Sequence, residues 1–364
     1  MTNNERLYVD IHVLQTVPPS CVNRDDTGSP KTAVYGGVTR ARVSSQAWKH
    51  AVRLRFRDTL CAGDISQRTS MVVDLVADEI ASARPELSGA QAQSLAQKVL
   101  EAAGIKIKEE KDKLRTDALF FISPGQISAL AEAAIQAKGG KPDKKVCQEA
   151  LKVHPGIDLA LFGRMVALKE DGSKLNVDAA AQVAHAISTH AVENEYDYFT
   201  AVDDCSPEDN TGAGHVGTVE FNSSTLYRYA NVNVMALQKM LGQAAPEAVG
   251  AFIEAFIRSM PTGKQNTFAN WTRPDAVYVT VRRDQPINMA GAFEKAVRPG
   301  NEGYVRRSVQ ALADYAKETY GNFASAPALE LTVGSGLEAL AAPCSVNEML
   351  DTLVRWLKDD EAQK

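Results

Sequence analysis

The sequence predicts an α+β fold in which an antiparallel sheet carries helices on one face and a helical block is inserted between its strands. Three stretches alternate apolar and polar residues with the period of a strand, at 7–13, 226–234 and 277–281. Between the first two, residues 64–154 are rich in Ala, Leu, Gln, Lys and Glu, which is typical of helices. The order of these segments favours the α+β class.

Composition indicates a soluble globular protein and argues against several other classes. The 364 residues are 45% hydrophobic and 23% charged, with a net charge of −5. Five scattered cysteines form no CxxC pair or zinc-type spacing, which fits a reducing cytosol, and neither a metal nor a cofactor is expected. The N-terminal residues do not resemble a secretory signal, and no apolar run is long enough for a membrane span. We therefore expect a cytoplasmic protein.

The N-terminal region is expected to contain a strand, a long loop and a helix. Leu7–Val13 alternates strictly, so it predicts a strand with one buried face. The stretch 18–37 is rich in Pro, Asn, Asp, Gly and Ser, which predicts an irregular loop. Ser44 or Ser45 can cap the next helix, which we expect to end near Arg57.

A basic segment, residues 27–57, contains no Asp or Glu although the whole chain is acidic. Its seven cations are Lys31, Arg40, Arg42, Lys49, Arg53, Arg55 and Arg57. In the expected helix, the stripe of Trp48, Val52 and Phe56 can dock on a sheet, beside a row of Lys49, Arg53 and Arg57. Such a local excess of cations predicts a site for an anion, and nucleic acid is the first candidate.

The middle of the chain, residues 64–154, is predicted to be mostly helical. Helical periodicity predicts helices at 71–84, 89–103 and 124–138. Residues 106–115 have mixed charge and are expected to be exposed. A further helix is expected at 176–192.

A long hairpin is expected at 194–222, and it returns into a central strand at 226–234. Tyr198 and Phe199 lie in its first arm, where an aromatic face could stack on a base. Nearby acids and the acidic tip 203–214 would repel a phosphate backbone, so we expect a wedge that touches bases. Amphipathic or apolar helices are then expected at 248–260, 287–297, 302–319 and 346–361, with a polar loop at 261–273.

Catalytic and metal signals are weak. Asp25 and Asp26 could hold Mg²⁺ for hydrolysis, although capping of their loop or pairing with Arg24 also explains them. His185 and His190 are five residues apart, so they would not share a helix face as zinc ligands do. No P-loop, Rossmann glycine fingerprint or nucleophile elbow is present.

Six motifs occur in an order that resembles one known family. They are LYVDIHVLQTVPPSCVNRDD, YGGVTRARVSSQAWKHAVR, GIDLALFGRM, AHAISTH with DYFTAVDD, GTVEFNSSTLYRYANVNV and NMAGAFEKAV. The chain resembles the CasC family, the backbone subunit of the type I-E CRISPR Cascade complex, in the RAMP superfamily. The resemblance is dense over 7–57, 156–234 and 261–297, and thin over the helical block and the C-terminus.

The resemblance implies a hand-shaped protein. Its palm would be a modified RRM, ferredoxin-like antiparallel sheet that carries a helical finger domain and a thumb hairpin. The implied segments are 1–60 (first part of the palm), 61–155 (finger domain), 156–193 (return to the palm), 194–222 (thumb) and 223–364 (second part of the palm with C-terminal helices).

The resemblance also implies the function: a non-catalytic, RNA-binding subunit in antiviral defence. Several copies would form a filament along the CRISPR RNA (crRNA) spacer, clamp its backbone and displace bases at intervals. The remaining bases would pair with target DNA. Other expected partners are Cascade subunits of the CasA, CasB, CasD and CasE types, and no membrane.

Most of the expected RNA contacts lie in the palm, and the others lie in the finger and the thumb. The predicted RNA-binding residues are Arg24, Lys31, Arg40, Arg42, Ser44, Gln46, Lys49, Arg53, Met165, Tyr198, Phe199 and Thr200. Tyr198 stands where a relative has an indole, and Val38 and Thr39 stand where it has cations, which leaves open whether that loop touches nucleic acid.

Two other functions remain as alternatives. RAMP relatives cut RNA with a loop carboxylate, so a metal-dependent endoribonuclease that uses Asp25 or Asp26 is the second hypothesis. A purely structural assembly protein that touches no nucleic acid is the third.

Overall fold

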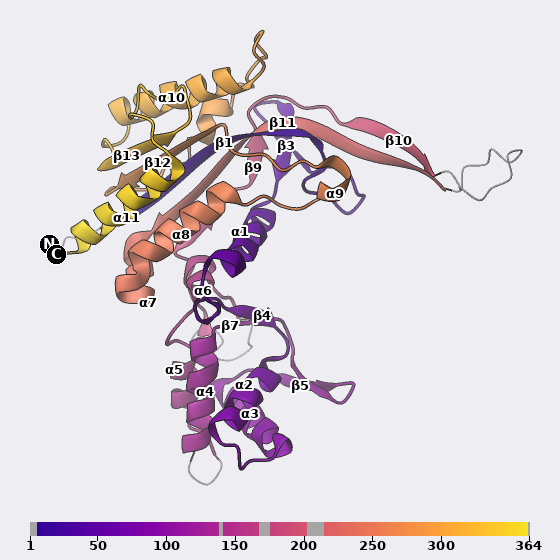
Figure 1. The fold of residues 1–364 in the computed structure, drawn as a ribbon, viewed down its shortest axis with the longest axis vertical. Helices are drawn as coiled ribbons and strands as arrows, with labels where there is room; N and C mark the ends of the chain where they lie inside the picture. Colours follow the sequence, from indigo (N-terminus) through magenta and orange to yellow (C-terminus); the bar gives the residue numbers. More distant parts are fainter. Residues whose placement is uncertain (1–5, 138–140, 167–174, 202–214, 363–364) are drawn as a thin grey trace, which may run out of the picture. The chain divides into compact units, whose positions relative to one another are not determined.

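The computed structural model describes residues 6–137, 141–166, 175–201 and 215–362 (Figure 1). The chain divides into two compact units. The sheet unit comprises Met1–Arg55, Val183–Asn231 and Val249–Lys364, and the helical unit comprises Phe56–Gln182 and Val232–Ala248. The predicted finger segment 61–155 falls within the helical unit, which also takes in residues up to Gln182 that were assigned to the palm.

One large sheet organises the sheet unit. Its strands are β1 (Tyr8–Ser20), β2 (Thr32–Tyr35), β3 (Val38–Val43), β8 (Ala181–Val183), β9 (Ala186–Ser188), β10 (Glu195–Ala201), β11 (His215–Asn233), β12 (Ala276–Arg282) and β13 (Leu329–Val333). The main path runs β13-β12-β1-β11-β9-β3-β2, and β8 and β10 each pair with β11. β12 is antiparallel to both β1 and β13, and β9 is antiparallel to both β11 and β3.

The centre of this sheet has the ferredoxin-like order. Along the chain, β1, α1 (Ser45–Thr59), β9, β11, α8 (Ala245–Arg258) and β12 form a β-α-β-β-α-β unit. In space the four strands lie in the order β12-β1-β11-β9, which is the order 4-1-3-2 within that unit. The predicted α+β class and antiparallel sheet are confirmed.

Helices cover both faces of the sheet, so the prediction of helices on one face was wrong. Figure 1 shows α10 (Val305–Asn322) on one side of β1 and β12, and α8 and α11 (Val346–Ala362) on the other. The polar side of β1 is therefore buried as well, and Asp10 and His12 are inaccessible to solvent. Aromatic residues on that face, among them Tyr227 and Tyr278, lie under α10 in one apolar cluster. This face cannot offer rings to bases as an ordinary RRM sheet does.

Two predicted helices are absent, and tertiary contacts explain both cases. Within 176–192 the chain forms β8 and β9, and β9 pairs with β11 through Ser188 and Leu226. Pairing with a buried strand outweighs a weak helical pattern. At 287–297 only a 3₁₀ turn forms, η5 (Met289–Phe293). A side chain at Gly291 would collide with the ring of Tyr315, which shows how closely η5 approaches α10.

The stretch predicted as an irregular loop, residues 18–37, contains more regular structure than expected. The expected irregular loop 18–37 contains the end of β1 and the strand β2, which joins β3 in a hairpin through Gly36 and Gly37. Both glycines have positive φ, as a two-residue hairpin turn requires.

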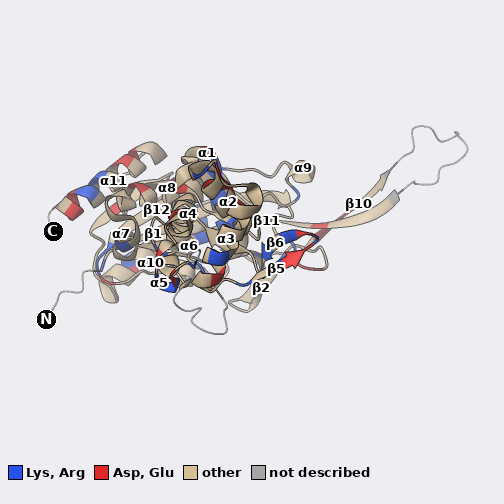
Figure 2. Ribbon diagram, turned by 90° about the horizontal axis from the view of Figure 1, so that it is seen from below, with Lys and Arg blue, Asp and Glu red and all other residues tan. Residues whose placement is uncertain are grey.

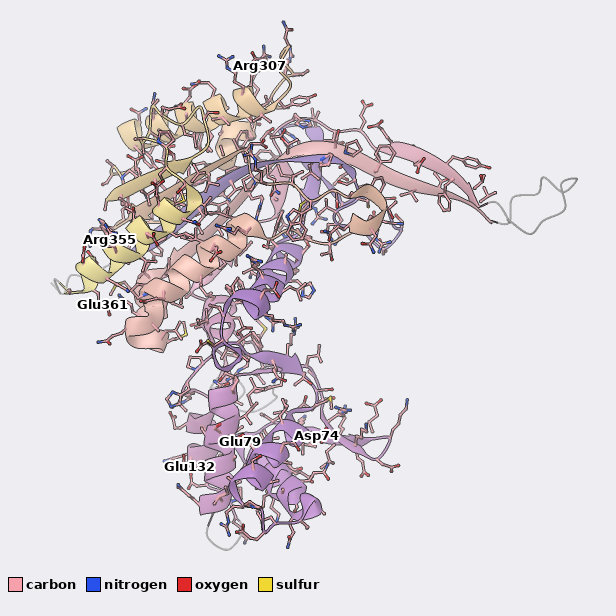
Figure 3. The ribbon with its side chains drawn as sticks, viewed as in Figure 1. Asp74, Glu79, Glu132, Arg307, Arg355 and Glu361 are labelled. Atoms are coloured by element: carbon pink, nitrogen blue, oxygen red, sulfur yellow. The ribbon has the colours of Figure 1, made fainter. Side chains whose placement is uncertain are left out.

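The helical unit confirms the three helices expected there. They are α2 (Val72–Ala83), α3 (Gly89–Ala103) and α4 (Pro124–Gln136), and α5 (Lys144–Ala150) follows. Ser88 and Ser123 cap α3 and α4, each in a capping box with a glutamine three residues later. Ser128 of α4 donates to Glu79 of α2 at 2.6 Å. Figure 3 labels Glu79 in this unit. Buried Val, Leu and Ala side chains from these helices form one core.

Residues 106–115 are exposed as expected, but they form a hairpin. β5 (Ile107–Glu110) pairs with β6 (Lys113–Thr116), and Lys111 and Asp112 between them have positive φ. Figure 2 shows both signs of charge on this hairpin.

The remaining elements are short, apart from one helix of two turns. They are η1 (Ala62–Asp64), β4 (Gln67–Thr69), β7 (Phe120–Ile122), α6 (Ile157–Phe162), α7 (Val234–Leu241), η4 (Gly242–Ala244) and α9 (Gln265–Phe268). In the described part of the chain, no helix combines the length and apolarity that crossing a membrane would require.

Candidate nucleic-acid interface

The N-terminus of α1 is tied to the loop that follows β1. Ser44 caps the helix, because its hydroxyl accepts from the backbone N–H of Ala47 at 3.3 Å. The backbone N–H of Ser44 donates to the side-chain oxygen of Asn23 at 2.9 Å. Ser44 is buried, and its cap fixes where α1 begins. The cap uses the hydroxyl oxygen only as an acceptor, so the expected contact of Ser44 with a phosphate stays a prediction.

Three predicted RNA-binding residues share the outer face of α1. Gln46, Lys49 and Arg53 are spaced i, i+3 and i+7, which places them in one row on a helix. Gln46 is exposed, and Lys49 and Arg53 are half-buried. Burial lowers the pKa of Lys49 from its ordinary value. A cation that has already lost part of its hydration shell loses less water when it meets a phosphate.

The inner face of α1 holds this row in place. Trp48 and Val52 are fully buried, and the ring centroids of Trp48 and Phe256 of α8 are 6.4 Å apart. Trp48 also belongs to an apolar cluster with Val17, Val43 and Leu226 of the sheet. The predicted arrangement of an apolar seam beside a cationic row is therefore present in the sheet unit.

Arg40 does not belong to the interface. Its side chain is inaccessible to solvent, and its guanidinium donates to backbone carbonyls of Tyr35, Ser188, Phe293 and Glu294 at 2.8–3.2 Å. With its donors bound to carbonyls, it cannot reach a phosphate. The prediction for Arg40 was wrong because the sequence pattern cannot show that β3 turns this position inward.

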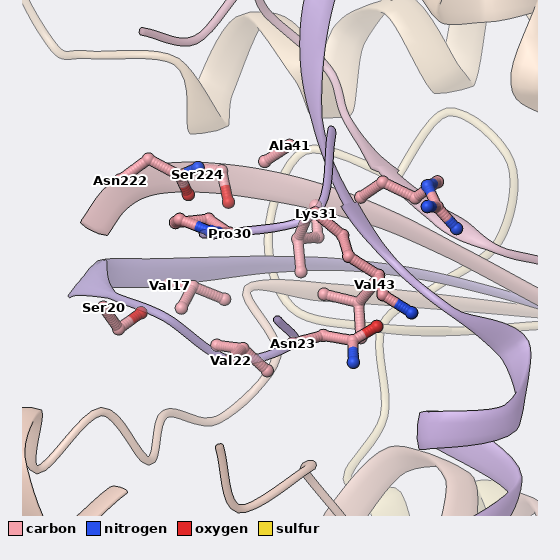
Figure 4. A pocket seen from close by; sticks show the side chains of 12 residues that line it. Val17, Ser20, Val22, Asn23, Pro30, Lys31, Ala41, Val43, Asn222 and Ser224 are labelled. Atoms are coloured by element: carbon pink, nitrogen blue, oxygen red, sulfur yellow. The ribbon is translucent and has the colours of Figure 1, made fainter. Parts of the chain in front are cut away.

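Lys31 and Arg42 meet beside the hairpin of β2 and β3. Both line a small cavity of about 20 Å³, with Asn23, Asn222 and Ser224 on its other walls (Figure 4). This volume holds about one water molecule. Arg42 also donates to the carbonyl of Thr32 and lies 3.2 Å from Nδ1 of His185. Burial, followed by the charges of Arg42 and Lys31, lowers the pKa of His185, so this region carries positive potential.

The loop with Arg24, Asp25 and Asp26 is exposed, and Asp25 organises it. A single oxygen of Asp25 accepts from the backbone N–H and hydroxyl of Thr27 and from the N–H of Ser29. These hydrogen bonds lower the pKa of the Asp25 carboxyl. Among the described residues, no three His, Cys, Asp or Glu side chains gather as a metal would require. The carboxylate therefore has a structural role that needs no metal.

The predicted thumb residues lie on β10, which forms a two-stranded ribbon with β11. Tyr198 is opposite Thr218, Phe199 opposite Gly217 and Thr200 opposite Val216. Tyr198 and Thr200 point to one face, and Phe199 points to the other. The tyrosine is 66% exposed and the phenylalanine 39%. The predicted tip 203–214 lies outside the described residues.

Met165 is strongly exposed in the helical unit, at 90% of its surface. The residue before it, Arg164, is buried and donates to the carbonyls of Phe121, Leu151 and Leu175 at 2.9–3.1 Å. Burial lowers the pKa of Arg164 to about 10. This anchor fixes the backbone from which Met165 projects, and no sequence pattern indicates it.

Comparison with protein families gives a match over nearly the whole chain. The family model described as "CT1975-like protein" matches residues 9–356. The chain belongs to this family.

Two solved structures similar to this CT1975-like protein both bear the name of a CRISPR RNA-guided surveillance complex. One chain, from a structure named "CRISPR RNA-guided surveillance complex, pre-nicking", is 37% identical with a TM-score of 0.82. The match covers 96% of this protein and 99% of that chain. Another, from a "CRISPR RNA-guided surveillance complex", is 32% identical with a TM-score of 0.71, covering 95% and 99%. Comparison with the curated proteins gave no match.

These similarities extend through both units of the CT1975-like protein. They include the helical block and the C-terminus, where the motif resemblance was thin. Within the sheet unit, the structure groups Gln46, Lys49 and Arg53 in one row and Lys31 and Arg42 in another. In the same unit Arg40 is enclosed by backbone carbonyls, and Ser44 caps α1.

Proposed function

We propose that this CT1975-like protein is the backbone subunit of a type I-E CRISPR surveillance complex, of the CasC kind, and binds crRNA. The observation that carries the proposal is the row of Gln46, Lys49 and Arg53 on α1. It is supported by the match to a chain of a CRISPR RNA-guided surveillance complex, which covers 96% of this protein. Phosphates supply most of the affinity in sequence-independent binding, and a rigid row of cations suits a repeating backbone. Lys31, Arg42 and Arg24 add cations from the neighbouring hairpin and loop.

In this proposal several copies form a filament along the spacer of the crRNA. Each copy clamps the backbone with its palm, and the thumb ribbon of a neighbour displaces a base at intervals. The finger residue Met165 contacts the RNA as well. The bases left in place pair with target DNA, which makes the assembly part of antiviral defence. The partners are subunits of the CasA, CasB, CasD and CasE types, in the cytoplasm.

We also propose that the protein is not itself catalytic. The hydrogen bonds that Asp25 accepts within its own loop support this view, because they engage one of its two carboxylate oxygens in holding the loop. Incubation of the assembled complex with complementary RNA and Mg²⁺ tests it. Intact RNA is the expected result. Cleavage that disappears in Asp26→Ala would establish the alternative endoribonuclease.

The main test is co-purification from cells that carry a CRISPR array, followed by sequencing of the bound RNA and native mass spectrometry. We expect spacer-length guide RNA and more than one copy of this chain per complex. Lys49→Glu with Arg53→Glu should abolish guide retention. The matched control reverses two exposed charges on α10, Arg306→Glu with Lys317→Glu, and should retain the guide. Random cellular RNA in the wild-type complex would refute the proposal.

A further inference from the structure

A second exposed tyrosine accompanies Tyr198 on the thumb ribbon. Tyr196 and Tyr198 are two residues apart on β10, so both side chains point to the same face. They are 67% and 66% exposed, and they lie opposite Glu220 and Thr218 of β11. Burial in the fold does not explain two neighbouring rings that remain two-thirds accessible, and this suggests that they meet a ligand.

The spacing of the two rings suits one flat group between them. Residues i and i+2 of an extended strand are about 6.8 Å apart, from a rise of about 3.4 Å per residue. Stacked bases are also separated by about 3.4 Å. One base placed between the rings of Tyr196 and Tyr198 would therefore be in van der Waals contact with both.

Phe199 does not take part in this arrangement, because it points to the opposite face of the ribbon. There its ring lies over Gly217, so closely that a side chain at position 217 would come within 2.4 Å of the ring. Phe199 thus fills the space left by the glycine and stiffens the ribbon. The two tyrosines are the accessible pair.

The surrounding charges favour a neutral occupant. Glu195 and Asp197 alternate with the tyrosines along β10, and Glu220 lies opposite Tyr196. Glu220 shares the face of the two rings, and Glu195 and Asp197 lie on the other face of the same ribbon. Together the three carboxylates make the ribbon negative, which repels a phosphate group, whereas an unpaired base carries no charge. The negative charges of the ribbon therefore favour a base that has been turned away from its phosphate backbone.

We propose that Tyr196 and Tyr198 form a sandwich for a single displaced nucleobase, with Tyr196 as a binding residue equal in weight to Tyr198. This inference rests on the proposed function and makes it more specific, because it defines which ring surfaces receive the base. The two rings bind a base by stacking, which does not depend on the identity of the base. The sandwich therefore accepts any base in the displaced position.

The test uses complexes assembled on synthetic guides that carry 2-aminopurine at one spacer position at a time. Its fluorescence is quenched by ring stacking, so a displaced base held between two tyrosines stays dark. We expect Tyr196→Ala and Tyr198→Ala each to shift the equilibrium between stacked and free base by about tenfold. Tyr196→Phe keeps the ring and should keep the quenching. Val216→Ala, which removes an exposed aliphatic group from the same ribbon, is the matched control.

Three results would overturn the inference, and they differ from one another. If only Tyr198→Ala restores fluorescence, Tyr198 stacks alone, and the proposed function survives. If Tyr196→Ala releases a protein subunit without changing fluorescence, the ring is a protein contact. If the wild-type complex holds no guide RNA, the proposed function fails together with this inference.

Discussion

The guanidinium carbon of Arg228 lies 3.7 Å from the centroid of the Trp48 ring, in the buried space between the sheet and α1. Arg228 also lies over the ring of Phe256, at 4.6 Å. Its Nη1 donates to the side-chain oxygen of Gln15 at 2.5 Å, and its Nη2 donates to the carbonyl of Phe256. Through these contacts one buried cation on β11 joins β1, α1 and α8. The position of Lys49 and Arg53 on α1 therefore depends on a buried cation of the sheet.

The first prediction concerns this buried arginine. Arg228→Leu should lower the free energy of unfolding by about 2–4 kcal/mol, because the buried oxygens of Gln15 and Phe256 lose their donors and the cation–π contacts are lost. Urea unfolding of the purified chain measures the change. Arg57→Leu, which removes an exposed arginine of α1, should shift stability by less than about 0.5 kcal/mol. Equal effects of the two variants would contradict the proposed anchoring.

The second prediction separates Arg40 from the cations that we propose to bind RNA. Arg40→Met should destabilise the chain by about 2–4 kcal/mol, since the carbonyls of Ser188 and Phe293 are left unsatisfied inside the fold. It should leave the salt dependence of RNA affinity unchanged wherever the variant is folded. Fluorescence anisotropy with a labelled guide, at several salt concentrations, measures this. A smaller salt slope in Arg40→Met would mean that the residue neutralises a phosphate after all.

The third prediction concerns Lys49 and Arg53. Each phosphate contact to single-stranded nucleic acid contributes about 0.7 to the slope of log affinity against log salt. Lys49→Gln and Arg53→Gln should each reduce the slope by about that amount, with little change in unfolding. The same titrations on Lys317→Gln, an exposed cation of α10, provide the control. If neither glutamine variant alters the slope, the assignment of α1 as the phosphate contact is wrong.

The fourth prediction concerns pH and the buried face of β1. Burial raises the pKa of Asp10 to about 7, against hydrogen bonds from the backbone N–H of Ile287 and the hydroxyl of Tyr229. Burial also lowers the pKa of His12 to about 3. Between pH 4 and 7 the folded state thus holds a proton on Asp10 that the unfolded state releases, and this contribution to stability is lost as the pH rises. His12 acts in the opposite sense, because the unfolded state takes up a proton below about pH 6.5.

Asp10→Asn should reveal the effect of His12 on the pH dependence of stability. Wild-type stability should change little between pH 4 and 6.5, where the two groups oppose each other, whereas the variant should lose stability as the pH falls. The difference in unfolding free energy, wild type minus variant, should decrease by up to about 4 kcal/mol from pH 4 to pH 7. Urea titrations at half-unit pH steps measure it. Parallel pH curves for the two proteins would show that Asp10 has an ordinary pKa.

Local patterns in the sequence predicted the elements whose formation depends on nearby residues. The helices α2, α3 and α4 have strong periodicity and their own caps at Ser88 and Ser123. The seam of Trp48 and Val52 and the row of Lys49 and Arg53 follow from helical spacing alone. For the same reason, the alternation in β1 and β12 was readable without any knowledge of their partners.

Long-range contacts determined the features that the sequence analysis missed. A helix at 176–192 was predicted, but β9 exists because β11 and β3 flank it. Arg40 and Arg42 look alike in the sequence, but only the first is enclosed, because it meets carbonyls from residues 188 and 293, far along the chain. Tyr196 was passed over, although strand spacing places it on the same face as Tyr198. That both rings stay exposed became visible only in the paired ribbon.

The sequence by itself determined the fold class, the inserted helical block, the cationic row of α1 and the family resemblance. Each of these depends on spacing along the chain, which the order of residues sets directly. Tertiary structure alone decided which cations face solvent, that both faces of the sheet are covered, and which rings of the thumb stay accessible. Those properties depend on what packs against a residue, because burial removes water from a charge and replaces it with fixed carbonyl partners. That exchange made Arg40 a structural residue, whereas Lys49 and Arg53 remain partly accessible on the outer face of α1.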